Sequence, residues 1–203
     1  MKKRIIASSL IVIGIIFGVI AKLNLTSDLD TFIYNIIIKM QSDSVTQIFK
    51  AITFLASTKF ILCFNIIALI IYIIKKRGYL LLIPVNSIFS VVSNNLIKFL
   101  IKRPRPNVLR LVTETNYSYP SGHAMISVLF YGTIITLLNR NNIKCRKIIN
   151  IILMLIILLV GVSRIYLGVH YASDIIGGYL ISTGLLLFTR KDSNNESINN
   201  RSK

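Results

Sequence analysis

The stretch SRIYLGVHYASD, from Ser163 to Asp174, decides how this chain is interpreted. It places an arginine, a histidine and an aspartate between two long apolar runs, where ionisable groups are costly and therefore indicate a function. Asp174 follows His170 by four residues. If the segment is helical there, both side chains share one face, and the carboxylate can hold one ring nitrogen while the other stays free to react. The spacing predicts an oriented, activated imidazole.

The composition predicts an integral membrane protein. Hydrophobic residues make up 54% of the 203 residues, which is too apolar for a soluble domain of this length. We therefore expect an all-α fold with one transmembrane domain over residues 1–189. The net charge of +17 fits nucleic acid, anionic lipid or an anionic substrate as partner. Most basic residues cluster at the ends of apolar runs, as topology signals do, and this pattern excludes a nucleic-acid groove.

Apolar runs predict a bundle of six membrane-spanning helices, at about 5–21, 60–74, 79–97, 123–138, 148–162 and 175–188. The first run has a signal peptide as its alternative, but it is long for that purpose. Basic clusters at 2–4, 75–77 and 140–147 place both termini in the cytoplasm. Residues 190–203, rich in Ser and Asn, are expected to form a disordered cytoplasmic tail.

Two segments outside the membrane are less regular. Residues 23–59 mix acids with short apolar patches, which predicts an external amphipathic helix near 32–40, or else a plain loop, with the second span starting within 48–56. Residues 98–119 are external yet strongly basic, against the usual charge bias, and binding of an anion would explain them. Cys63 and Cys145 are expected to be free thiols, and no clustered Cys/His metal site is present.

The predicted topology brings three separate segments to the outer edge of the membrane. Arginine and lysine side chains suit the oxygens of a phosphate. A helix beginning just after Pro120 would add backbone and hydroxyl donors at its N-terminus. The candidate phosphate-binding residues are Lys98, Arg105, Ser121, Gly122 and Arg164. Cations and hydrogen-bond donors arranged around a phosphoryl group in this way can stabilise its transfer without a metal or other cofactor.

The chain contains two histidines, and the predicted topology places both at this same edge. His170, held by Asp174, is the candidate nucleophile that accepts the phosphoryl group. His123 would then protonate the leaving oxygen and later activate water. The catalytic candidates are therefore His170, His123 and Asp174. The sequence leaves open whether Lys102, Arg103 and Arg110 support the site, contact lipid headgroups or are solvated.

At these residues the chain resembles the type 2 phosphatidic acid phosphatase superfamily. The resemblance has three parts, which occur in order within residues 98–174: a lysine followed after six residues by Arg-Pro, the sequence Pro-Ser-Gly-His, and Ser-Arg, five residues, His, three residues, Asp. These match Lys98, Arg105 and Pro106; Pro120, Ser121, Gly122 and His123; and Ser163, Arg164, His170 and Asp174. One part alone would be weak evidence, but three intact parts are specific.

The resemblance implies a six-helix membrane bundle and metal-independent removal of phosphate from a membrane lipid. It also implies a phosphohistidine at His170, with His123 as general acid and base and Asp174 as the orienting group. In short bacterial members with an outward-facing site, the usual substrates are undecaprenyl pyrophosphate and phosphatidylglycerol phosphate. We expect the first, with phosphatidylglycerol phosphate or phosphatidic acid as the alternative.

Other functions remain open at this point. The same site would serve a phosphotransferase that passes the phosphoryl group to another lipid or to a glycan. A transporter or lipid-binding protein is disfavoured because the polar groups cluster at one edge rather than at the midplane. Haloperoxidases hold vanadate in a related site, but they are soluble enzymes, and the six predicted spans argue against that activity here. The sequence leaves the headgroup, the lipid tail and the oligomeric state undecided.

Overall fold

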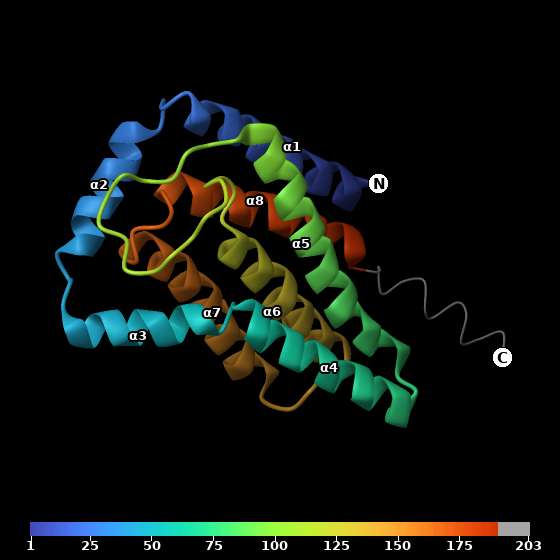
Figure 1. The fold of residues 1–203 in the computed structure, drawn as a ribbon. Coiled ribbons are helices and arrows are strands. Elements are labelled where there is room, and N and C mark those ends of the chain that lie inside the picture. The colour runs from blue at the N-terminus through green and yellow to red at the C-terminus, as the bar shows by residue number, and fades with distance from the viewer. Residues whose placement is uncertain (191–203) are drawn as a thin grey trace.

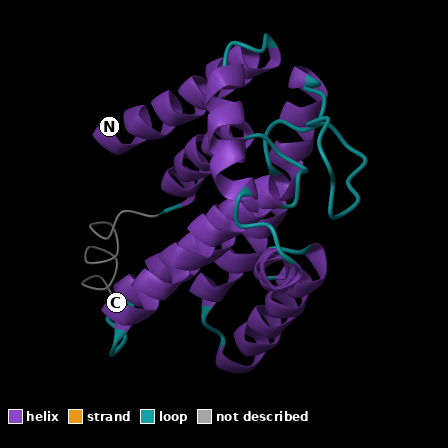
Figure 2. Cartoon of the chain, turned by 90° about the vertical axis from the view of Figure 1, so that its left-hand side faces the viewer, coloured by secondary structure: helices purple, strands orange, loops and turns teal. Residues whose placement is uncertain are grey.

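The computed structural model describes residues 1–190, and these residues form helices and loops with no strand (Figures 1 and 2). The α-helices are α1 (Lys2–Lys22), α2 (Ser27–Ile38), α3 (Asp43–Phe54), α4 (Thr58–Lys75), α5 (Leu82–Ile101), α6 (Gly122–Arg140), α7 (Arg146–Tyr166) and α8 (Ala172–Thr189), with a short 3₁₀ helix, η1 (Gly78–Leu81), before α5. The predicted all-α fold is confirmed. Apart from Arg190, the expected tail at 190–203 lies outside the described residues.

Six helical stretches are long and apolar enough to cross a membrane: Lys2–Lys22, Asp43–Lys75, Gly78–Ile101, Gly122–Arg140, Arg146–Tyr166 and Ala172–Thr189. Their outward faces carry many exposed Ile, Val, Leu and Phe side chains, as a lipid-facing surface requires. α6 is the central helix and packs against α5, α7 and α8. The multi-span architecture predicted from hydropathy is therefore correct.

α1 lies along α8, and small residues let the two helices approach closely (Figure 1). A side chain at Gly14 of α1 would meet Ile181, and one at Gly177 of α8 would overlap the ring of Tyr119. Tyr119 is fully buried and donates its hydroxyl to the carbonyl of Gly14. Small residues at such contacts are a general device of membrane helix packing. The contact also ties the loop before α6 to α1.

Residues 23–59 differ from the prediction. They form two helices, α2 and α3, where one amphipathic helix near 32–40, or a loop, was expected. α3 begins after an N-cap at Ser42, whose hydroxyl accepts a hydrogen bond from the amide of Val45 at 3.3 Å. A second cap at Ser57, which accepts from the Phe60 amide at 3.3 Å, separates α3 from α4. Short polar caps of this kind break an apolar run that hydropathy alone treats as continuous.

Two asparagines of α5 connect helices, as expected for polar groups inside a membrane bundle. Asn86 donates to the hydroxyl of Thr133 on α6 at 2.7 Å. Asn94 donates to the carbonyl of Pro120 at 3.0 Å, directly before α6. The first bond joins α5 to the second half of α6, and the second holds α5 against the start of α6, where predicted site residues lie.

Replacing Gly177 by alanine tests the packing of α1 and the Tyr119 loop against α8. The new methyl group would overlap a tyrosine that is buried and hydrogen-bonded, so the helices must separate. We expect a destabilisation of roughly 1–3 kcal/mol, typical of overpacking, seen as a lower midpoint of thermal unfolding in detergent. Gly78→Ala is the matched control, because nothing lies within 4 Å of its added methyl group. Equal midpoints for the two variants would contradict this account.

Candidate active site

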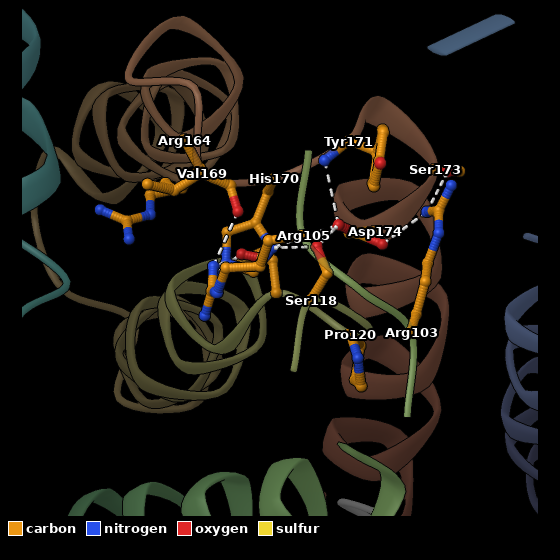
Figure 3. A network of polar contacts seen from close by, with 12 residues as sticks. Arg103, Arg105, Ser118, Pro120, Arg164, Val169, His170, Tyr171, Ser173 and Asp174 are labelled. Atoms are coloured by element: carbon orange, nitrogen blue, oxygen red, sulfur yellow. Dashed lines mark hydrogen bonds and ion pairs between the residues drawn. The ribbon is translucent and has the colours of Figure 1, made fainter. Parts of the chain in front are cut away.

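The site lies where three segments meet: the end of α5 with the loop 102–121, the start of α6, and the turn between α7 and α8 (Figure 3). Lys98 is in the last turn of α5, so the loop begins at Lys102 and not at Lys98, where the sequence was expected to leave the helix. Lys102 has a left-handed backbone with φ of 53°, which ends the helix. The loop then contacts the end of α7, where the Leu111 amide donates to the Leu167 carbonyl at 3.1 Å, and the first turn of α8 at Asp174, before α6 begins.

The decisive stretch 163–174 is not one helix. Arg164 belongs to the last turn of α7, which extends beyond the expected end of the fifth span near residue 162. A turn follows in which Gly168 has φ of 72°, and a side chain there would collide with the carbonyl of Leu109. α8 then begins with Tyr171 as its N-cap, and the Asp174 carboxylate accepts from the Tyr171 amide at 3.0 Å. His170 therefore precedes the helix that contains Asp174.

The predicted contact between His170 and Asp174 is present, although its geometric reason was wrong. Nδ1 of His170 lies 3.2 Å from Oδ2 of Asp174, which it reaches across a capping box rather than along a helix face. Nε2 lies 3.2 Å from a guanidinium nitrogen of Arg105. One ring nitrogen is thus held by a carboxylate, and the other faces a cation (Figure 3).

Burial sets the protonation state of this imidazole. His170 is buried, and burial, together with the nearby charges of Arg164 and Arg105, lowers its pKa to about 3, against the opposing influence of Asp174. The ring is therefore neutral at physiological pH. Because Nδ1 shares its proton with Asp174, the lone pair is on Nε2, the nitrogen that faces Arg105. Burial also lowers the pKa of Arg105 from its ordinary value.

The three predicted phosphate-binding cations come from α5, the loop 102–121 and α7, and Arg105 is the one that contacts this nitrogen among the described residues. The Lys98 ammonium donates to the carbonyls of Tyr117 and Ser118. Arg105 donates to the carbonyl of Val169 at 2.7 Å. Arg164 donates to the Thr53 hydroxyl at 3.0 Å, while its Nε is buried and has no partner among the described residues. A buried donor without a partner is costly and marks a place for an acceptor.

A carboxylate already bridges two of these cations. Glu114, in the loop before α6, pairs with Arg164 and lies 3.5 Å from Arg105. Its side chain is 29% exposed, against 2% for Arg164 and 6% for Arg105. The carboxylate therefore sits on the open side of two buried guanidinium groups, where an anionic ligand would approach them.

The predicted residues at the start of α6 lie in the site but differ in their contacts. The Ser121 hydroxyl accepts from the Ala124 amide at 3.4 Å as the helix cap, and its amide donates to the Asp174 carbonyl at 3.2 Å. Gly122 lies against Asn94, since an added side chain would approach the Asn94 amide to 3.2 Å. The His123 side chain makes no hydrogen bond within residues 1–190 and is free to contact a ligand.

Several polar residues of the site were not assigned from the sequence. Arg103, whose role was left open, is buried and pairs with Asp174. Ser118 donates to the same carboxylate. Asp30, on α2, pairs with Arg103. The one signal in the sequence is the Arg-Pro-Arg-Pro run at 103–106, which does not show which arginine points inward.

Three hollows reach the site. One of about 390 Å³, beside α2 and the turn after α7, has Asp30, Arg103, His170 and Tyr171 among its lining residues. An apolar groove of about 380 Å³ runs between α4, α5 and α6 to His123, with Ile61, Leu62, Ile88 and Val91 among its lining residues. A polar hollow of about 420 Å³ lies over Arg105 and Glu114 in the loop 102–121. Among residues 1–190 no three His, Cys, Asp or Glu side chains gather as metal ligands do.

Comparison with known proteins assigns the family. Residues 78–197 match the PAP2 superfamily. The chain belongs to this superfamily. Phosphatidylglycerophosphatase B of Bacillus subtilis is 31% identical over 186 residues, which cover 89% of this chain and 90% of that protein. Undecaprenyl-diphosphatase of Sulfolobus acidocaldarius is 30% identical over 122 residues, or 57% of this chain and 56% of that protein.

Solved structures agree with the PAP2 fold. The crystal structure of a transmembrane PAP2-type phosphatidylglycerolphosphate phosphatase from Bacillus subtilis superimposes with a TM-score of 0.84 at 28% identity, covering 98% of both chains. Aquifex aeolicus LpxE has a TM-score of 0.62 at 24% identity, covering 79% of this chain and 94% of that one, and supports the fold alone. This PAP2 protein is a membrane enzyme that acts on lipid phosphates.

Replacing Glu114 by glutamine tests whether its carboxylate occupies a phosphate site. The change removes a negative charge that competes for Arg164 and Arg105 and would repel an incoming phosphate. We expect inorganic phosphate to inhibit the variant at concentrations about tenfold lower than the wild type, which corresponds to ~1.4 kcal/mol. Asp43→Asn, an exposed acid on α3, is the control. Weaker phosphate inhibition of Glu114→Gln would show that the carboxylate instead positions the arginines.

Proposed function

We propose that this PAP2 protein removes the terminal phosphate of a membrane lipid through a phosphohistidine at His170. The observation that supports it is the divided environment of this neutral imidazole. Its Nδ1 faces a buried carboxylate, and its Nε2 faces the guanidinium of Arg105. A nucleophile held by one partner and aimed at a cationic site is the arrangement that covalent catalysis needs.

In the first step the lone pair on Nε2 of His170 attacks phosphorus, and the bond from phosphorus to the lipid oxygen breaks. His123, whose side chain makes no hydrogen bond within residues 1–190, lies at the end of the apolar groove and gives a proton to the departing oxygen. Asp174 holds the Nδ1 proton and stabilises the positive charge that the phosphorylated ring acquires. In the second step His123 takes a proton from water, whose oxygen attacks phosphorus and releases inorganic phosphate and neutral His170.

The transferring phosphoryl group carries charge on its oxygens, and stabilising that charge is the main demand of the reaction. Lys98, Arg105 and Arg164 would supply it, with the unpartnered Nε of Arg164 taking one oxygen. At the start of α6 the Gly122 amide would add a backbone donor and the Ser121 hydroxyl could donate its proton, while the Ser121 amide stays bound to the Asp174 carbonyl. Glu114 would leave the arginines when the phosphate arrives.

The substrate we propose is phosphatidylglycerol phosphate. A relative named phosphatidylglycerophosphatase B aligns over almost the whole chain, and a structure with a matching title superimposes over 98% of it. The apolar groove beside His123 suits a lipid tail entering from the bilayer. Undecaprenyl pyrophosphate, the substrate expected from the sequence, is the second candidate, favoured by the relative named undecaprenyl-diphosphatase.

The covalent mechanism makes His170 indispensable. His170→Ala should abolish phosphate release from lipid substrates in detergent, with a loss of at least about 1,000-fold. His123→Ala should lose about 100- to 10,000-fold, the usual range for a general acid. Both losses are measured as phosphate released per folded protein, with EDTA present throughout. Substantial activity in His170→Ala would contradict the mechanism, and loss of wild-type activity in EDTA would contradict a metal-independent site.

The substrate is decided by comparing purified protein on phosphatidylglycerol phosphate, undecaprenyl pyrophosphate and phosphatidic acid under the same conditions. We expect the highest kcat/KM for the first. A preference for undecaprenyl pyrophosphate would establish the second candidate. Transfer of labelled phosphate to another lipid or a glycan, with little free phosphate, would indicate a phosphotransferase instead.

We also propose that residues 1–189 form one membrane domain with both termini in the cytoplasm and the active site outside. α1 and α7 begin with basic residues, and α4 and α6 end with them. These four helix ends lie at the end of the bundle away from the loop 102–121 (Figure 1). Three basic residues lie on the opposite side, against the usual preference of Lys and Arg for cytoplasmic loops: Lys98, Arg103 and Arg105. Their contacts are with groups of the site, which explains their position.

Cysteine labelling tests this orientation. Cys145 is exposed in the loop between α6 and α7, and a Cys63→Ser background leaves it as the sole thiol. A membrane-impermeant maleimide should label Cys145 in inverted vesicles and not in intact cells. Asn107→Cys, at an exposed position of the site loop, in a background lacking both native cysteines should show the opposite pattern. Labelling of Cys145 in intact cells would reverse the proposed topology.

A further inference from the structure

The loop after α5 buries an arginine that belongs to none of the three motifs. Arg103 is 2% exposed, and its backbone carbonyl accepts from the Ser118 amide at 2.8 Å. Its guanidinium lies over the ring of Tyr171, 3.9 Å from the ring centre. A buried cation is strongly unfavourable unless it is paired and hydrogen-bonded. The contacts that offset this cost indicate what Arg103 does.

Arg103 is bound between two carboxylates. Its Nη1 donates to Oδ1 of Asp174 at 2.6 Å and to the Ser173 hydroxyl at 2.7 Å. Its Nη2 donates to Oδ2 of Asp30 at 2.9 Å. The two nitrogens of the fork therefore contact different helices, α8 and α2. A planar fork with fixed donors is well suited to hold two anions in a set relation.

The two oxygens of Asp174 have different partners, because Arg103 binds one of them. Oδ1 is held by Arg103, whereas Oδ2 faces Nδ1 of His170 and also accepts from the Ser118 hydroxyl and the Tyr171 amide. A carboxylate with one oxygen fixed in this way cannot rotate away from the imidazole. Arg103 thus defines which oxygen of Asp174 orients His170.

Asp30 holds this arrangement from the opposite side. It is 4% exposed in the first turn of α2, and its Oδ1 accepts from the Ser173 amide at 2.8 Å. Its Oδ2 accepts from the hydroxyls of Ser173 and Thr26 at 2.7 and 2.9 Å. α2 is thereby fixed to the first turn of α8, next to Asp174. Without Asp30, the guanidinium would have a single carboxylate partner.

Asp30 also changes the net charge of the group of side chains next to His170. Asp174 and Arg103 alone form a neutral pair, which would stabilise a cationic phosphohistidine poorly. With Asp30, two carboxylates and one guanidinium leave a formal charge of −1 beside the ring. Opposite charge close to a developing cation lowers the energy of the state that carries it, most strongly in a dry site.

We infer that Asp30 and Arg103 are positioning residues for the reaction, acting on His170 through the Asp174 carboxylate. This inference rests on the proposed phosphohistidine mechanism. It extends the site from the three motifs to α2, which precedes the family match at residues 78–197. It requires no contact between Asp30 or Arg103 and the substrate.

Steady-state kinetics on Asp30→Asn, Arg103→Lys and Arg103→Met test the inference. We expect kcat per folded protein to fall about tenfold in Asp30→Asn and about 100-fold in Arg103→Met, the range seen on removing an outer hydrogen-bond partner of a site. KM should stay within about twofold if both residues act through Asp174 alone. A large rise in KM would instead show that they contact a ligand in the hollow that they line with His170, and would overturn the inference. Arg103→Lys keeps the charge but loses the fork, so its kcat should lie between wild type and Arg103→Met.

Matched controls separate positioning from folding. Asp28→Asn removes an exposed acid from the same helix, and Lys102→Met removes an exposed cation next to Arg103, so both should keep wild-type kcat. Folded protein is quantified by size exclusion and circular dichroism in detergent. If Arg103→Met does not fold, Asp30→Asn and Arg103→Lys carry the test. A purely structural role would lower the unfolding midpoint and leave kcat per folded protein unchanged.

The outcomes distinguish this inference from the proposed function. Wild-type kcat in both Asp30→Asn and Arg103→Lys, with His170→Ala inactive, would overturn the positioning role and leave the mechanism standing. Activity in His170→Ala would overturn the mechanism itself. A fall in kcat at constant KM in Asp30→Asn, with Asp28→Asn unaffected, would establish the inference.

Discussion

The buried carboxylate of Asp174 is the interaction on which the site depends. It is 0% exposed, and a buried charge of this kind costs several kcal/mol unless its oxygens are satisfied. Its partners come from the loop after α5, the turn after α7 and the first turn of α8. One anion therefore fixes the loop 102–121, the nucleophile and the start of α8 in a single arrangement.

This requirement explains why the loop between α5 and α6 is long and polar yet largely ordered by contacts. Arg103 and Ser118, fifteen positions apart in the sequence, both bind Asp174, and the Ser118 amide also binds the Arg103 carbonyl. The loop closes on itself around the carboxylate. The apolar groove ends at His123 and the polar hollow lies over Arg105 and Glu114, which suits a substrate with an apolar tail and an anionic head.

Much of the fold and the location of the site could be predicted because polar residues stand out in an apolar chain. The helical spans follow from hydropathy, and Lys98, Arg105, Arg164, His123, His170 and Asp174 do lie around one site. The helical argument for His170 and Asp174 failed, because capping of α8 by Tyr171 and Asp174 was not foreseen. An aspartate at the third position of a helix bonds back to the N-cap, and this brings it to a histidine just outside the helix.

The rest could not be predicted because it depends on which loop residues are buried. Arg103 and Arg110 look alike in the sequence, yet one is buried between two acids and the other is exposed. Asp30 looks like an ordinary acid in the first turn of an amphipathic helix. Only the packing of α2 against α8 shows that it faces an arginine from another segment.

Direct detection of the covalent intermediate tests the central claim. Protein mixed with a ³²P-labelled lipid phosphate is quenched at alkaline pH, where a phosphoramidate survives, and digested for mass spectrometry. The phosphohistidine mechanism predicts a labelled peptide phosphorylated on His170, absent from His170→Ala and discharged by longer incubation. Full turnover with no label on His170, or label on another residue, would contradict it.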